Sequence, residues 1–289
     1  MILLLGGTAD GRVLAETLHQ QGIPIIYSIA GLVRVPTVAC EILTGGFTPL
    51  GGLEHVIKEK NIQAILDVTH PYAELMSTKA VTAARQCDIP YWRFHREEWR
   101  AEKGDDWHML NDWQEAFPLL ENKQSVLLSA GQLDQAFMDT LAANNTNNSL
   151  VSKRVSKRVP KRVPKRVSKR VSKRVPKRVP ERVPQTQLLR TAVEPKTVLP
   201  PSMQWIKAIG PFSYDDELAL LQQHNIDVIV SKNSGGDATV AKLRAARAMG
   251  IPVLMLKRPL LPNGDKTFFS RQECEQFIIK NMAGKHDAL

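Results

Sequence analysis

Short apolar runs alternate with amphipathic helical patterns along most of the chain, and this alternation limits the possible fold more than any other feature. The predicted strands cover residues 2–5, 24–29, 63–68, 90–94, 125–129, 204–209, 226–231 and 252–256. The predicted helices lie near 10–21, 52–60, 73–87, 132–142, 214–224, 237–249 and 271–282. Because such alternation is typical of strands that run parallel, the pattern predicts an α/β protein with parallel sheets.

The length of the chain favours two domains over one. A chain of 289 residues exceeds the usual size of a domain, and its 43% apolar residues can supply two cores. A polar stretch follows the predicted strand that ends at Phe94, so we place the boundary near residue 100. We predict two small doubly wound domains, 1–100 and 101–289, that face each other across a cleft.

A basic repeat interrupts the predicted second domain. Residues 151–184 repeat Val-Ser/Pro-Lys-Arg and hold fifteen Lys or Arg against the single Glu181. The whole chain has a formal net charge of +10, and this segment alone carries +14, so the remainder has a net charge of −4. Prolines and like charges oppose an ordered fold, so we predict a disordered insertion over about residues 143–186. Non-specific binding of nucleic acid or acidic membrane is its alternative role.

Cysteine usage and the amino terminus favour a cytoplasmic protein. Cys40, Cys87 and Cys274 lie far apart without a C-x-x-C motif, so we predict neither a disulfide framework nor a metal site. The first residues lack the basic region of a signal peptide, and no apolar run approaches the ~20 residues of a membrane span. We expect no membrane association.

Polar side chains appear abruptly where the third predicted strand ends. Asp67, Thr69 and His70 stand there, before Pro71. Ligands of parallel α/β sheets bind outside such strand ends, so Thr69 and His70 are candidate catalytic residues. Two roles stay open: His70 can donate a proton, or both side chains can hold the turn and hydrogen-bond a ligand. Asp67 is expected to orient the backbone or His70.

A glycine turn follows the first predicted strand and precedes a helical pattern. Gly6 and Gly7 would let the backbone approach an anion, and the helix that begins after Thr8 would offer N–H groups and a positive dipole to a phosphate. The spacing of Gly6, Gly7 and Gly11 departs from the G-x-G-x-x-G fingerprint. The turn is therefore either a cofactor phosphate site or a plain tight turn.

Two further turns of this kind occur in the second half of the chain. The first holds Ser231, Lys232, Asn233, Ser234, Gly235 and Gly236. Its cation, hydroxyls and backbone N–H groups can bind an anionic cofactor, although the order is not that of a Walker motif. A solvated loop with a capped helix is the alternative. The second turn is Gly210-Pro-Phe-Ser213, whose serine can cap the following helix.

Taken in order, these motifs resemble those of the precorrin-6A reductase family. They are Leu5-Gly-Gly-Thr-Ala-Asp-Gly-Arg12, Gly45-Gly-Phe47, Asp67-Val-Thr-His-Pro-Tyr-Ala73, Gly210-Pro-Phe-Ser213, and Ser231-Lys-Asn-Ser-Gly-Gly236 with Lys242 and Arg258-Pro259. The resemblance covers nearly the whole chain apart from about residues 143–186. Two positions depart from the family: Thr48-Pro49 replaces further glycine after Phe47, and Asp10 stands where Glu is common.

The resemblance implies a cytoplasmic oxidoreductase of cobalamin biosynthesis, with two Rossmann-like domains and NADPH or NADH in their cleft. It implies reduction of one double bond in a carboxylate-bearing tetrapyrrole, with or without cobalt. The candidate partners of this substrate are Arg12, Arg34, Tyr72 and Lys242, and Lys232 is a candidate for substrate as well as cofactor. Each cation could equally be a solvated surface charge. No specific nucleic acid is expected, and the oligomeric state stays open.

Two other functions fit parts of the sequence. A nucleic-acid-binding protein would act through the basic repeat. Another Rossmann oxidoreductase, acting on a nucleotide sugar or a hydroxy acid, would share the fold, but the chain has no Tyr-x-x-x-Lys pair.

Overall fold

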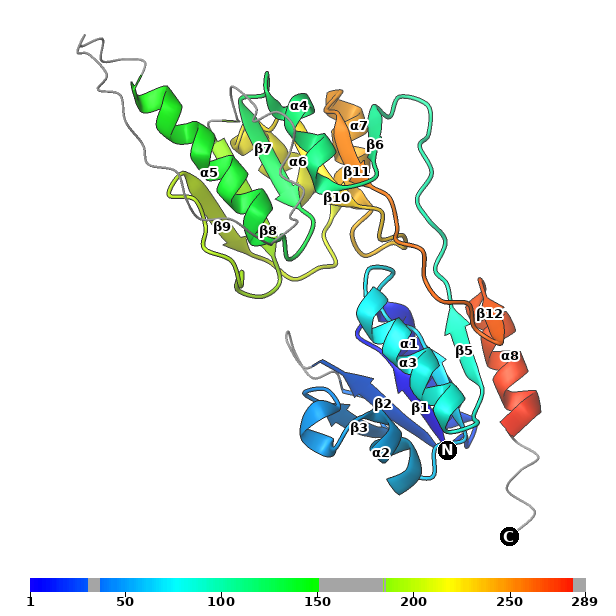
Figure 1. Cartoon of the computed structure of the whole chain (residues 1–289). Coiled ribbons are helices and arrows are strands. Elements are labelled where there is room, and N and C mark those ends of the chain that lie inside the picture. Colours follow the sequence, from blue (N-terminus) through cyan, green and yellow to red (C-terminus); the bar gives the residue numbers. More distant parts are fainter. Residues whose placement is uncertain (31–36, 151–183, 185, 283–289) are drawn as a thin grey trace, which may run out of the picture. The chain divides into compact units, whose positions relative to one another are not determined.

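The chain forms two compact units in the computed structural model, which describes residues 1–30, 37–150, 184 and 186–282 (Figure 1). Unit 1 contains Met1–Arg100, Asn233–Val240 and Arg258–Leu289. Unit 2 contains Ala101–Lys232 and Ala241–Lys257. Arg34 and most of the predicted insertion over 143–186 lie outside the described residues.

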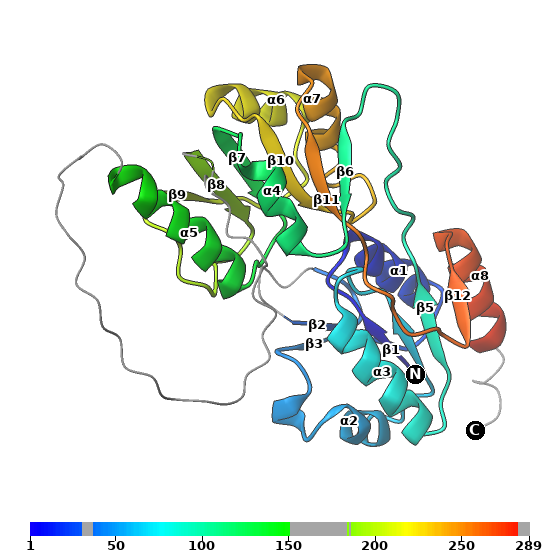
Figure 2. The same cartoon turned by 45° about the horizontal axis from the view of Figure 1, so that its top comes forward.

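Unit 1 is a six-stranded parallel sheet with helices on both faces. The strand order is β12-β5-β4-β1-β2-β3. The bounds are β1 Ile2–Leu5, β2 Ile25–Ile29, β3 Glu41–Thr44, β4 Ala64–Asp67, β5 Tyr91–Phe94 and β12 Lys266–Phe268. Helices α1 (Ala9–Gln20) and α8 (Arg271–Met282) cover one face, and α2 (Leu53–Glu59) and α3 (Glu74–Gln86) cover the other (Figure 2). A short 3-10 helix spans Thr48–Leu50.

Unit 2 repeats this architecture with a second six-stranded parallel sheet, of order β6-β11-β10-β7-β8-β9. The bounds are β6 Trp107–Leu110, β7 Ser125–Ser129, β8 Thr186–Thr191, β9 Met203–Lys207, β10 Val228–Lys232 and β11 Val253–Leu256. The helices are α4 Ala116–Leu120, α5 Gln135–Leu150, α6 Tyr214–Gln223 and α7 Ala241–Met249, with a 3-10 turn at Trp113–Glu115. Helices α4 and α5 pack on one face of this sheet. In the described part of the chain, no helix is long and apolar enough to cross a membrane.

The strand order places a topological switch point in each sheet. In unit 1 the first strand, β1, lies between β2 and β4, and in unit 2 strand β7 lies between β8 and β10. The connections therefore turn in opposite directions on the two sides of β1 and of β7, which opens a crevice at their carboxyl ends. The predicted α/β class with two Rossmann-like parallel units is confirmed. The predicted cleft between the units stays a prediction.

Four strands were missing from the sequence prediction, and each lacks a plain apolar run. Strand β3 is a partly exposed edge, β6 is an edge strand with an exposed centre, and β12 has three residues. Strand β8 begins immediately after the basic repeat and buries the polar Gln187 and Arg190. Helix α5 also runs to Leu150, so the predicted insertion begins inside a helix.

The composition of unit 1 differs from the predicted division into 1–100 and 101–289. The first crossing does fall at residue 100, but the chain returns twice to unit 1. Strand β12 pairs with β5 at the edge of the first sheet, and α8 packs on its face beside α1. Residues 233–240 also belong to unit 1, and α7 begins at Ala241 rather than near the predicted 237.

Replacing Phe268 tests whether the carboxyl-terminal segment completes the core of unit 1. Phe268 is 0% exposed and packs 5.2 Å from the ring of Phe277, measured between centroids, whereas the adjacent Phe269 is 59% exposed. We expect Phe268→Ala to lower the free energy of unfolding by about 3–5 kcal/mol, since it leaves a cavity, and the matched control Phe269→Ala to lower it far less. Urea denaturation followed by circular dichroism measures both. Equal effects would contradict the packing.

Candidate functional site

A buried carboxylate organises the carboxyl ends of β4 and β5. Asp67 is 0% exposed. Its Oδ1 accepts hydrogen bonds from the backbone N–H of Thr69 at 2.9 Å and from the Thr69 hydroxyl at 2.6 Å. Its Oδ2 accepts from the Tyr91 hydroxyl at 2.6 Å and from the Arg93 guanidinium at 2.8 Å. Asp67 therefore fixes the Thr69 side chain, as an orienting residue of this turn.

Arg93 neutralises Asp67 inside the protein. Its side chain is 4% exposed, and it also donates to Ser77 Oγ at 2.9 Å. Burial, together with the Asp67 charge, raises the pKa of the Tyr91 phenol, so Tyr91 keeps the proton that it donates to the carboxylate. The Nε atom of Arg93 is buried and has no hydrogen-bond partner among the described residues. Burying this nitrogen without a hydrogen bond makes the Asp67–Arg93 pair less stabilising than a fully bonded pair would be.

The glycine turn after β1 is packed on a tyrosine. The Gly7 N–H donates to the Tyr27 hydroxyl at 3.1 Å, and a Cβ on Gly6 would lie 2.1 Å from the Tyr27 ring. Thr8 caps helix α1, because its hydroxyl oxygen accepts from the Gly11 N–H at 3.0 Å. The same hydroxyl donates to the carbonyl of Val68 at 2.9 Å. Gly6 is therefore required by packing inside the protein, and Thr8 ties the β1 turn to the β4 turn.

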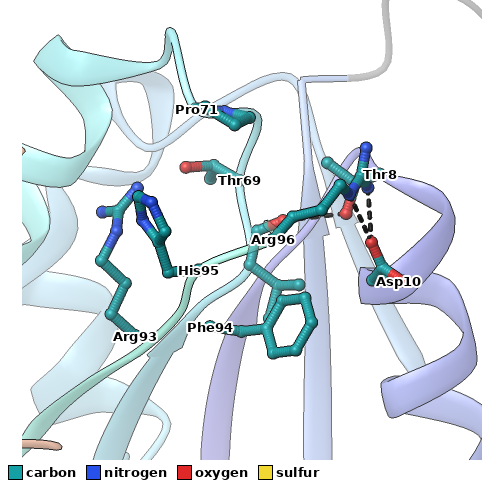
Figure 3. A pocket seen from close by; sticks show the side chains of 9 residues that line it. Thr8, Asp10, Thr69, Pro71, Arg93, Phe94, His95 and Arg96 are labelled. Atoms are coloured by element: carbon teal, nitrogen blue, oxygen red, sulfur yellow. Dashed lines mark hydrogen bonds and ion pairs between the residues drawn. The ribbon is translucent and has the colours of Figure 1, made fainter. Parts of the chain in front are cut away.

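A pocket lies over these strand ends within unit 1 (Figure 3). It has room for about one water molecule, and its lining residues are Thr8, Asp10, Val68, Thr69, Pro71, Arg93, Phe94, His95 and Arg96. Arg96 and Asp10 form an ion pair at 2.6 Å on one side, and Asp10 also lies 3.8 Å from Arg271. Burial, with the nearby charges of Arg258 and Arg93, lowers the pKa of His95, which favours its neutral form. The lining cations Arg93 and Arg96 are each paired with a carboxylate.

The predicted catalytic histidine contacts the turn that follows β10. His70 Nε2 lies 3.1 Å from Ser234 Oγ, and its Nδ1 accepts from the Tyr72 N–H at 3.3 Å. This second contact requires a lone pair on Nδ1, so we place the ring hydrogen on Nε2, facing Ser234. The Tyr72 hydroxyl accepts from the Asn233 N–H at 2.9 Å, and burial raises the pKa of Tyr72 to about 12. Residues 70, 72, 233 and 234 thus form one assembly within unit 1.

Two glycines and Arg258 hold the 233–236 segment in place. A Cβ on Gly235 would lie 2.1 Å from the Glu97 carbonyl, and one on Gly236 would lie 2.9 Å from the Arg96 side chain. Arg258 donates to the carbonyl oxygens of Asn233 at 2.8 Å, Arg96 at 2.5 Å and Glu97 at 3.1 Å. These glycines are therefore needed for close packing between two loop segments.

The other residues that the sequence predicted to bind cofactor or substrate differ from one another in their exposure. Arg12 is exposed on α1, and Arg34 lies outside the described residues. Ser231 is buried at the end of β10 in unit 2, and burial lowers the pKa of the neighbouring Lys232. Lys242 is only 3% exposed, so it is not accessible to a substrate carboxylate in this structure. This differs from the predicted substrate contact, because the side chain points into the core of unit 2.

Lys242 lies near a buried ion pair in unit 2. Arg190 on β8 donates two hydrogen bonds of 2.9 Å to the carboxylate of Glu217 on α6, and its guanidinium carbon lies 4.3 Å from the centroid of the Phe212 ring. Burial, together with the Arg190 charge, lowers the pKa of Lys242 to about 7, while Glu217 opposes the shift. The cluster contains two basic side chains and one carboxylate, all buried.

Sequence reasoning missed Arg93, His95 and Arg96, although a signal for them was present. Strand β5 turns polar at its carboxyl end just as β4 does, and the same rule would have placed these residues at the site. Arg258 was noted only in the family motif Arg258-Pro259. Neither its contacts nor the Arg190–Glu217 pair has a comparable signal, because the partners are distant in sequence.

The fold and the site define a class: a Rossmann-like α/β protein of two doubly wound units, with polar side chains gathered at the switch point of its first sheet. The family model described as Precorrin-6x reductase CbiJ/CobK matches residues 1–172 and 172–278. The chain belongs to this reductase family, which confirms the resemblance seen in the motifs.

Relatives and a solved structure agree with this assignment. The chain is 34% identical to a precorrin-6A reductase of Rhodococcus erythropolis over 92% of both chains. It is 26% identical to a cobalt-precorrin-6A reductase of Priestia megaterium, covering 91% of this chain and 92% of the relative. The solved structure of "CobK precorrin-6A reductase" has a TM-score of 0.74 and 27% identity, with 96% of each chain covered.

Replacing Arg93 tests the buried pair. Arg93→Met would leave the Asp67 carboxylate buried without its cation, so we expect the free energy of unfolding to fall by about 3–5 kcal/mol. The matched control is Lys60→Met, which removes the cation of the exposed Lys60–Glu41 pair and should change stability little. Urea denaturation at pH 7 measures both variants. An equally small effect of Arg93→Met would show that the pair does not organise the strand ends.

The burial of Lys242 predicts that the stability of the protein depends on pH. Its pKa is about 7 in the folded chain and near its ordinary value of 10.5 in the unfolded chain, so the unfolded state binds more protons between these values. The wild type should therefore gain stability relative to Lys242→Met as the pH rises from 7 towards 10.5, with its largest deficit below pH 7. Urea denaturation of both proteins at pH 6, 7.5 and 9 measures the difference. A difference that does not vary with pH would contradict the burial of a titrating lysine.

Proposed function

We propose that this chain reduces one double bond of a precorrin-6A-type tetrapyrrole in cobalamin biosynthesis, with a reduced nicotinamide nucleotide as the electron donor. The observation that carries the proposal is the end-to-end match to relatives named precorrin-6A reductase, which are 31–34% identical over 89–92% of this chain. The polar pocket at the switch point of unit 1 supports it, since nucleotides bind at such positions.

The small pocket offers contacts for a single group of a nicotinamide dinucleotide. It has room for about one water molecule, so it can take an amide or hydroxyl group of the cofactor while the rest of the ligand lies outside it. The hydroxyl groups of Thr8 and Thr69, which are partly buried, offer polar contacts at this pocket. We propose that the cofactor is held by Gly6, Gly7 and Thr8 in one turn and by Lys232, Ser234 and Gly235 in the other. Ser231 and Asn233 are buried and support the second turn from beneath.

The chain favours NADPH over NADH. NAD-binding proteins of this fold commonly hold the ribose diol with a carboxylate about 20 residues beyond the glycine turn, at the end of the second strand. Here Ser28, Ile29 and Ala30 occupy that stretch, so no carboxylate is supplied there.

When bound, the cofactor supplies a hydride, and the protein supplies position and electrostatics. The conjugated ring of the substrate can itself accept electron density, which reduces the need for a dedicated acid. We propose that His70 is a positioning residue, because its Nε2 hydrogen faces Ser234 and its Nδ1 is occupied by the Tyr72 N–H. Held in this way, Ser234 can direct its hydroxyl hydrogen to the ligand.

The substrate's carboxylates need cations that solvent can reach. Arg12 is exposed on α1 in the turn that follows β1, and it stays a proposed partner. Tyr72, at the other turn, is half-buried and can contribute a hydroxyl contact. We expect the metal-free ring to be the better substrate, because the relatives named precorrin-6A reductase are more similar to this chain than the cobalt-precorrin-6A reductase of Priestia megaterium.

An anaerobic assay tests both the reaction and the role of His70. Purified protein is mixed with each ring form and with NADPH or NADH, and the loss of reduced nucleotide is followed together with the macrocycle absorbance. We expect NADPH oxidation that depends on the metal-free ring. For His70→Ala we expect kcat/KM to fall roughly fivefold to tenfold, mainly through KM, since one hydrogen bond is lost.

The matched control for this variant is His55→Ala, because His55 is exposed on α2. A fall in kcat of about 10²–10⁴ for His70→Ala would instead identify His70 as the proton donor. If neither nucleotide were oxidised with either ring form by the folded wild type, the proposed function would be wrong.

A further inference from the structure

We propose that the pocket over β1, β4 and β5 receives a hydrogen-bond-donating group from the nicotinamide half of the cofactor, and that Asp67 and Arg93 are positioning residues that fix this preference. The inference deepens the proposed function and rests on it. It follows from three properties of the lining: the direction of two hydroxyl groups, the balance of charge, and the place of the pocket in the sheet.

The hydroxyl of Thr69 is fixed as an acceptor towards the pocket. A threonine hydroxyl has one hydrogen to donate and two lone pairs that accept. Thr69 gives its hydrogen to Asp67 Oδ1 at 2.6 Å, and Asp67, being paired with Arg93, stays an acceptor. Thr69 lines the pocket and is only partly buried, so its lone pairs are what a ligand meets. Thr69 is therefore not the source of a proton for the substrate.

The hydroxyl of Thr8 has the same polarity. It donates its hydrogen to the Val68 carbonyl at 2.9 Å and accepts from the Gly11 N–H at 3.0 Å, which leaves one lone pair. Thr8 and Thr69 both line the pocket, from the turns after β1 and β4. Two acceptors of fixed direction call for N–H or O–H groups on the ligand.

The charges around the pocket leave little attraction for an anion. Asp10 neutralises Arg96 on one side (Figure 3). Asp67 neutralises Arg93 on the other. His95 Nε2 lies 3.2 Å from the Arg258 guanidinium, which requires a lone pair on that nitrogen and thus a neutral ring. A phosphate or a carboxylate would bring charge without finding an unpaired cation in this lining.

The position of the pocket selects the nicotinamide half. Its lining residues come from the ends of β1, β4 and β5, on the side of the switch point away from β2. The glycine turn next to it directs the Gly7 N–H to Tyr27, so this N–H is already satisfied within the protein. The groups of the cofactor that donate hydrogen bonds without carrying charge are the carboxamide NH₂, the adenine amino group and the ribose hydroxyls. Proteins of this fold hold the adenosine ribose at the end of the second strand, so a pocket away from β2 is left to the carboxamide NH₂ and the ribose hydroxyls of the nicotinamide half.

Ligand analogues measured by isothermal titration calorimetry test the inference without turnover. The probes are NADP⁺, its 3-acetylpyridine analogue, which lacks the NH₂ group, a form with deoxyribose on the nicotinamide side, and adenosine 2′,5′-bisphosphate. The protein variant is Thr69→Val, which keeps the shape of the side chain but removes the acceptor. Thr69→Ser keeps the hydroxyl, and Thr82→Val is the control, because Thr82 is exposed on α3 and bonds only its own helix backbone at Thr78.

We expect the wild type to bind NADP⁺ at least fivefold more tightly than one of the two altered dinucleotides. The acetylpyridine probe identifies the carboxamide as the donor, and the deoxyribose probe identifies the ribose. Thr69→Val should abolish this ratio, while Thr69→Ser and Thr82→Val keep it. All four proteins should bind adenosine 2′,5′-bisphosphate within twofold of one another, which also shows that they are folded.

Two results would overturn the inference alone: a wild-type preference that survives in Thr69→Val, or a loss of adenosine 2′,5′-bisphosphate binding as large as the loss of NADP⁺ binding. A wild type that binds none of the dinucleotides would overturn the proposed function as well. The two failures are therefore distinguishable.

Discussion

The hydrogen bonds to the buried carboxylate of Asp67 determine the shape of the site at the end of the first sheet. They join the end of β4 to Tyr91 and Arg93 of β5, and they fix the Thr69 hydroxyl. A buried ion pair of this kind is seldom retained for stability alone, because an apolar replacement often packs as well. The partnerless Nε of Arg93 adds to that cost. The pair instead sets the direction of the hydrogen bonds at the site, because the Asp67 carboxylate can only accept them.

The glycines around the site serve close packing as well as any contact with a ligand. Gly6 leaves room for the ring of Tyr27, and Gly235 leaves room for the Glu97 carbonyl. The two turns are thereby pressed against neighbouring segments before any cofactor binds, which lowers the cost of ordering them on binding. A glycine-rich turn in such a sequence therefore indicates where a site lies. It does not by itself identify the group that binds there.

Much of the architecture could be predicted from the sequence, because buried parallel strands such as Ile2–Leu5 are continuous apolar runs and the helices between them are amphipathic. The edge strands were not predicted, because β3 and β6 are partly exposed and β12 is very short. The polar end of β4 pointed to Asp67, Thr69 and His70; the structure joins Thr69 to Asp67, whereas His70 contacts Ser234, and their roles in the reaction stay predictions. The polar end of β5 would have pointed to Arg93 in the same way, whereas the partners of Arg258 and the burial of Lys242 depend on long-range contacts that no local pattern carries.

The central claim is that Thr8 and Thr69 meet the nicotinamide half of a dinucleotide. The most direct measurement is methyl NMR of protein with labelled threonine methyl groups, titrated with NADP⁺, nicotinamide mononucleotide and adenosine 2′,5′-bisphosphate. The account predicts that the Thr8 and Thr69 methyl resonances shift with the first two ligands and stay in place with the third. Resonances that stay in place while NADP⁺ saturates the protein, or that shift with the adenosine ligand alone, would contradict it.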